Sequence, residues 1–196
     1  MGVIHDNARR NPAWQALVLG LFYIACFLAA GLGSLFTMVS LGSWYTALAK
    51  PSWNPPSWVF GPVWTVLYAM MAMAGWLVWR RGGPAMRPAV QWFAVQLVLN
   101  VGWSAVFFGL QMPGLAFAEI LVLWGAIAVT LVSSWRVSRP AGVLLVPYLV
   151  WEIRRGKAHG HTWFTWFKPR GHSDIGPDVG VRYTKPGIDE ARGARR

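Results

Sequence analysis

Charged residues are scarce in this chain. They make up 13% of its 196 residues, whereas an ordinary soluble domain devotes about a quarter of its residues to Asp, Glu, Lys and Arg. Cysteine is scarcer still, because Cys26 is the only one, and no intramolecular disulfide can form. The composition therefore disfavours a single water-facing domain and excludes a disulfide scaffold.

Acidic residues are few as well. Seven Asp and Glu stand against 18 Lys and Arg, which gives a net charge of +11. Such an excess is typical of nucleic-acid-binding proteins, but here the basic residues lie between and after long apolar blocks, where membrane proteins keep them. We therefore predict no nucleic-acid partner and expect the lipid bilayer to surround the protein.

The sequence also lacks the usual patterns of catalytic and metal sites. It has no Gly-rich phosphate loop, no Ser/His/Asp constellation and no paired carboxylates. His159 and His161 are two residues apart with no cysteine nearby, which is weak evidence for a metal site. We predict no metal, no required cofactor and no hydrolytic chemistry.

Four apolar blocks are long enough to cross a bilayer, which takes about 20 residues of helix. Proline and glycine mark their boundaries, and backbone groups in lipid must be paired within the segment, so the blocks are predicted to be helices. They cover residues 13–39, 57–79, 89–110 and 114–135.

A fifth apolar block, residues 141–151, is much shorter. Its eleven residues would reach only about 16 Å at 1.5 Å per residue, and Glu152 then opens a polar segment. We therefore predict an all-α integral membrane protein with five helices, the fifth truncated after Trp151. Residues 1–12 form an N-terminal segment, and residues 152–196 are predicted to be a basic, disordered tail.

Fourteen tryptophans exceed what anchoring at a membrane interface usually requires. Gln96, Asn100, Trp103 and Phe107 recur at i, i+4, i+7 and i+11, which places them on one helix face. Two amides and two aromatic rings suit a flat, conjugated ligand with polar edges. The same amides are equally typical of hydrogen bonds between membrane helices.

Three spaced motifs carry a family resemblance. They read WYTALAKPSWNPPSWVFGPVWTVLY from Trp44 to Tyr68, QLVLNVGWSAVFFG from Gln96 to Gly109, and PYLVW from Pro147 to Trp151. Together, in this order, they resemble the TspO/MBR family of tryptophan-rich sensory or translocator proteins. The resemblance covers roughly residues 25–151 and stops at Glu152, where the family's fifth helix would continue with further apolar turns.

The resemblance implies five transmembrane helices and a pocket, beneath the first loop, that binds porphyrins such as haem and protoporphyrin IX. The expected function is that of a receptor or carrier in tetrapyrrole transport, sensing or stress regulation. We expect a multi-pass protein of a bacterial cell membrane. The ligand contacts implied are Trp44, Tyr45, Trp53, Asn54, Pro55, Trp64, Asn100, Trp103, Phe107 and Trp151.

Two other functions stay open at this point. Pocket tryptophans beside a photoexcited porphyrin could make the protein a light-dependent porphyrin-degrading enzyme, or the altered fifth helix could leave a variant that binds nothing. Small residues at Ala25, Ala29 and Gly33 permit close helix contact within one chain or in a homodimer. Glu119, the sole acid inside a predicted span, either reaches the interface or acts on a proton or ligand.

Overall fold

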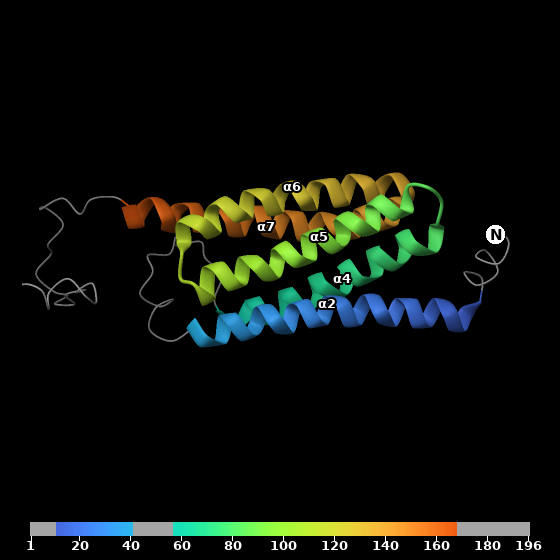
Figure 1. Ribbon diagram of the computed structural model, residues 1–196, viewed down its shortest axis with the longest axis horizontal. Coiled ribbons are helices and arrows are strands. Elements are labelled where there is room, and N and C mark those ends of the chain that lie inside the picture. Colours follow the sequence, from blue (N-terminus) through green and yellow to red (C-terminus); the bar gives the residue numbers. More distant parts are fainter. Residues whose placement is uncertain (1–10, 41–56, 168–196) are drawn as a thin grey trace, which may run out of the picture. The chain divides into compact units, whose positions relative to one another are not determined.

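The computed structural model describes the backbone of residues 11–40 and 57–167, and the side chains of residues 11–38 and 58–157. Every regular element in these ranges is helical (Figure 1). The elements are α2 (Pro12–Ser40), α4 (Ser57–Arg81), α5 (Met86–Ser104), the π-helix η1 (Ala105–Gly109), α6 (Pro113–Val137) and α7 (Arg139–Phe167). Because η1 continues α5 directly, the predicted bundle of five helices is confirmed. The helices lie in the compact unit Met1–Trp166, apart from the last residue of α7.

Local sequence explains where these helices begin and end. The side chain of Asn11 accepts a hydrogen bond from the backbone N–H of Ala13 at 2.9 Å, which caps α2. Pro113 opens α6, where a missing N–H costs nothing. Gly82 and Gly83 follow α4 with φ of 67° and 85°, a conformation that favours glycine. The turns between the helices therefore follow from capping residues visible in the sequence.

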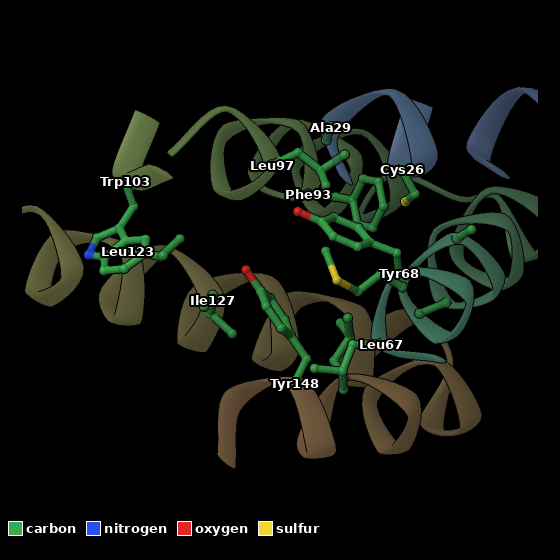
Figure 2. Packing of buried hydrophobic residues seen from close by; sticks show 14 of the residues in the cluster. Cys26, Ala29, Leu67, Tyr68, Phe93, Leu97, Trp103, Leu123, Ile127 and Tyr148 are labelled. Atoms are coloured by element: carbon green, nitrogen blue, oxygen red, sulfur yellow. The ribbon is translucent and has the colours of Figure 1, made fainter. Parts of the chain in front are cut away.

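The core of the unit lies where α2, α4, α5 and α6 pack together. Helix α2 packs on α4 and α5, and α5 packs on α6. Helix α7 runs beside α6 (Figure 1), and the indole N–H of Trp124 donates to the backbone carbonyl of Glu152 at 3.0 Å. Figure 2 shows Leu123 and Ile127 of α6 among the buried side chains that fill this interior.

The outward surface of the bundle is strongly apolar. On α2 a stripe of large side chains is exposed along the whole helix, at a spacing of three or four residues. It consists of Leu17, Leu21, Ile24, Leu28, Leu32 and Leu35. Among the described residues, four helices are long and apolar enough to cross a membrane, namely α2, α4, α5 with η1, and α6. Together these features describe a multi-pass integral membrane protein, in which the exposed apolar side chains of the helices face the lipid.

The predicted end of the fifth helix at Trp151 is wrong. Helix α7 continues through Glu152 and the following charged residues to Phe167, so residues 152–167 are not a disordered tail. The remaining part of the predicted tail, residues 168–196, lies outside the described residues. The prediction failed because it counted each charge after Trp151 as a separate cost of burial.

The charges of α7 are in fact divided between its two faces. Glu152 is buried and forms an ion pair with Arg155, one turn further along the same helix. Ile153, Arg154 and Lys157 are exposed. Because the inward-facing carboxylate is neutralised within its own turn, the helix continues without an unpaired buried charge.

The contact between α7 and α6 beyond Trp151 can be tested at Gly156. A Cβ added to Gly156 would collide with the indole ring of Trp124. We expect Gly156→Ala to lower the free energy of unfolding by about 1–3 kcal/mol, the usual cost of overpacking. The measurement is thermal or denaturant unfolding of the protein in detergent.

Gly125→Ala is the matched control, because Gly125 is also helical but a Cβ there meets nothing within 4 Å. This substitution should raise stability by up to about 1 kcal/mol through helix propensity. If Gly156→Ala behaves like Gly125→Ala, the distal part of α7 does not pack on Trp124.

Candidate ligand-binding site

A buried hydrogen-bond network joins three helices at the centre of the bundle. The hydroxyl of Tyr68 on α4 donates to Oδ1 of Asn100 on α5 at 3.2 Å. Nδ2 of Asn100 in turn donates to the hydroxyl of Tyr148 on α7 at 2.8 Å. Figure 2 shows the two tyrosine hydroxyls directed into the interior. Asn100 thus forms hydrogen bonds between helices, which was one of the two roles expected for the amides on this helix face.

An aromatic wall, formed by Trp103, Phe107 and Phe108, continues the same face of α5 into η1. The rings of Trp103 and Phe107 stack with centroids 4.8 Å apart and an angle of 12° between their planes. Phe108 meets Trp103 edge-on at 5.9 Å. The backbone N–H of Leu110 donates to the carbonyl of Ala105 at 2.9 Å, which is the wider bonding of a π-helix. Such π-helical turns are frequent at functional sites.

Trp64 and Trp151 extend the aromatic surroundings from α4 and α7. The Trp64 ring lies 5.3 Å from the Tyr68 ring and 6.4 Å from the Tyr148 ring, measured between centroids. Trp151 meets Phe60 edge-on at 5.9 Å. Trp64 therefore borders the hydrogen-bond network of Asn100, and Trp151 joins α7 to α4 through Phe60.

A charged side chain connects Trp64 with Trp103. The guanidinium carbon of Arg155 lies 4.0 Å from the centroid of Trp103 and 5.0 Å from that of Trp64. Its Nη2 lies 2.6 Å from Oε2 of Glu152, and the two side chains are 8% and 0% exposed. Arginine is well suited to this position, since its planar cation stacks on aromatic rings and pairs with carboxylates.

Glu152 and Arg155 were not predicted as site residues from the sequence. A signal was present, because Tyr148, Glu152 and Arg155 follow one another at i, i+4 and i+7 and so share a face of one helix. Mean hydropathy does not show this signal, because it is averaged over all faces of a helix. On that measure, both charged residues were placed in the predicted tail.

Buried polar groups without a hydrogen-bond partner lie on α5, α6 and α7. Among the described residues, both carboxylate oxygens of Glu119, both amide atoms of Gln96 and the indole nitrogen of Trp151 have none. Glu119 is close enough to Arg155 and Glu152 to interact with them electrostatically. Such atoms can bind a water molecule or the polar edge of a ligand.

The structure places only part of the predicted ligand contacts. It describes Trp64, Asn100, Trp103, Phe107 and Trp151. The others lie outside the described residues, namely Trp44, Tyr45, Trp53, Asn54 and Pro55. In the part of the chain that is described, no group of three His, Cys, Asp or Glu side chains could hold a metal ion.

The small-residue stripe of α2 contributes a contact within the chain. A Cβ added to Gly33 would lie 3.2 Å from the hydroxyl oxygen of Ser104 on α5, and Ala29 is buried in the core. These two small residues therefore allow α2 and α5 to approach each other closely. The homodimer that they also permit stays a prediction.

Removing the amide of Asn100 tests the hydrogen-bond network. Asn100→Ala leaves the hydroxyls of Tyr68 and Tyr148 without this partner, and we expect the free energy of unfolding to fall by about 1–3 kcal/mol. Tyr148→Phe should then cost less in the Asn100→Ala background than in the unaltered chain, because the bond is already lost. Unfolding in detergent measures all of these variants.

Tyr23→Phe is the control, since the half-buried Tyr23 on α2 takes no part in this network. Its effect should be the same in both backgrounds. Equal costs of Tyr148→Phe in the two backgrounds would show that Asn100 and Tyr148 are not coupled.

Comparison with known proteins assigns most of the bundle to one family. Residues 22–153 match the sequence model of the TspO/MBR family, and the match ends two residues before Arg155. Tryptophan-rich protein TspO of Chlorobaculum tepidum is 45% identical over 141 residues, which cover 70% of this chain and 88% of that protein. The translocator protein of Homo sapiens is 41% identical over 133 residues, which cover 66% of this chain and 79% of the human protein. The tryptophan-rich sensory protein of Cereibacter sphaeroides is 39% identical over 141 residues, 72% and 85% of the two chains.

Proposed function

Because this chain belongs to the TspO/MBR family, we propose that it is a membrane receptor or carrier that binds a porphyrin, such as haem or protoporphyrin IX, or a similar flat hydrophobic molecule. The stacked pair of Trp103 and Phe107 is the observation that carries this proposal. With Trp64 on the neighbouring helix, it offers large aromatic faces beside polar atoms inside an apolar bundle.

In this proposal, stacking adds to the binding free energy that comes from burying the apolar surface of the ligand. Aromatic pairs contribute about 0.5–1.5 kcal/mol beyond the area that they bury. A ligand lying against Trp64 and Trp103 would gain such contacts over much of its ring system. The exposed apolar surface of the helices allows a hydrophobic ligand to arrive through the lipid.

Polar atoms fix the orientation of the ligand. The amide of Gln96 and the indole nitrogen of Trp151 are buried and have no hydrogen-bond partner among the described residues. Hydrogen bonds to the edge of a flat ligand would satisfy them, and binding would then remove a cost that the empty protein bears. Ligands that lack polar edges should therefore bind less tightly than porphyrins.

Tryptophan fluorescence provides the direct test. Titration of the detergent-purified protein with protoporphyrin IX should quench the emission, because the proposed contacts are indoles. Replacing Trp64 and Trp103 together by alanine should raise the Kd about tenfold or more, since two stacking contacts are lost.

Trp92→Ala is the matched control, because Trp92 lies on α5 but is 40% exposed on the outside. Its Kd for protoporphyrin IX should equal that of the unaltered protein. Its total fluorescence should be smaller, because one tryptophan has been removed. An unchanged Kd in the double variant of Trp64 and Trp103 would eliminate the proposed site.

A further inference from the structure

Arg155 occupies the ring surface that a flat ligand needs. The Trp103 ring is stacked on Phe107, and the guanidinium of Arg155 lies over the same ring, so Trp103 is left only 2% exposed. The guanidinium also lies over Trp64. A porphyrin cannot stack between these two indoles while the arginine is there.

The guanidinium has the properties of a bound ligand. It is flat, it lies over two aromatic rings, and its charge is neutralised by the buried carboxylate of Glu152 at 2.6 Å. We propose that Arg155 is an internal ligand of the aromatic site, which closes the site against flat ligands until the segment 152–157 of α7 withdraws. This inference rests on the proposed function and adds to it how binding is controlled.

Withdrawal does not require separating the two charges. Glu152 and Arg155 are three residues apart on one helix, so they leave the site together as an ion pair. The hydrogen bonds that join Tyr68, Asn100 and Tyr148 are made one turn earlier in α7, outside the segment that moves. In this scheme, binding replaces Arg155 in the site by the ligand, and these three side chains continue to join the helices.

Trp124 of α6 holds the segment in the closed position. Its indole N–H donates to the carbonyl of Glu152 at 3.0 Å, and its ring lies directly against the backbone of Gly156. Both contacts are made by the segment that must move. The strength of this attachment sets the fraction of molecules in which the site is open. The apparent Kd equals the Kd of the open state divided by that fraction.

The test compares protoporphyrin IX binding by the full chain and by the double variant Glu152→Gln with Arg155→Met. The double variant removes both charges at once, so that neither is left unpaired. If the open state holds a tenth of the molecules or less, the double variant should bind about tenfold more tightly or better. Trp124→Phe, which keeps both charges but removes the N–H, should tighten binding by a smaller factor.

Arg154→Met is the matched control, because it removes a positive charge from the exposed neighbouring position of the same helix. It should bind like the unaltered chain. A double variant that binds no more tightly than the unaltered chain would overturn the inference and leave the proposed function standing. Weaker binding would mean that Arg155 contacts the ligand instead of excluding it.

If neither the full chain nor the double variant binds protoporphyrin IX, the proposed function fails. Unfolding temperatures then test whether the ion pair of Glu152 and Arg155 is enclosed by Trp64 and Trp103. Glu152→Gln and Arg155→Met should each lower the unfolding temperature by more than the double variant does, since each leaves one buried charge without its partner. Small and additive shifts would show that the pair is not enclosed between the indoles, and the inference would be overturned.

Discussion

The ion pair between Glu152 and Arg155 is the interaction on which the fifth helix and the site both depend. A single unpaired charge buried inside the bundle costs several kcal/mol, so neither side chain would be stable there alone. Paired within one turn, they let α7 continue past Trp151 with both of these charges inside the bundle. The indoles of Trp64 and Trp103 then cover the cation, and Trp124 holds the backbone that carries it.

This arrangement changes how the aromatic site is understood. The residues shared with the TspO/MBR family supply aromatic faces and amides, while the helix beyond the family match supplies a cation that lies on those faces. In the scheme that we propose, the affinity for a ligand is the difference in free energy between two states of the site, one occupied by Arg155 and one occupied by the ligand.

Hydropathy and proline positions were enough to predict the first four helices, because lipid requires long apolar segments with internally paired backbones. They failed at α7, whose buried positions Ala141, Leu145, Tyr148 and Glu152 keep a helical spacing across the point where polar residues begin. The aromatic residues of the site were predictable from the family motifs. The role of Asn100 was not, since a buried amide can bind a ligand or another helix with equal ease, and only its two tyrosine partners decide between them.

Hydrogen exchange along the backbone of α7 tests the central claim most directly, because it leaves both paired charges in place. In the unaltered chain we expect the backbone amides of residues 152–157 to exchange slowly, like those of residues 141–151, because α7 continues through these residues and packs on Trp124. Fast exchange at all of residues 152–157 would contradict this expectation, because the helix would then end near Trp151 and Arg155 could not lie on Trp103.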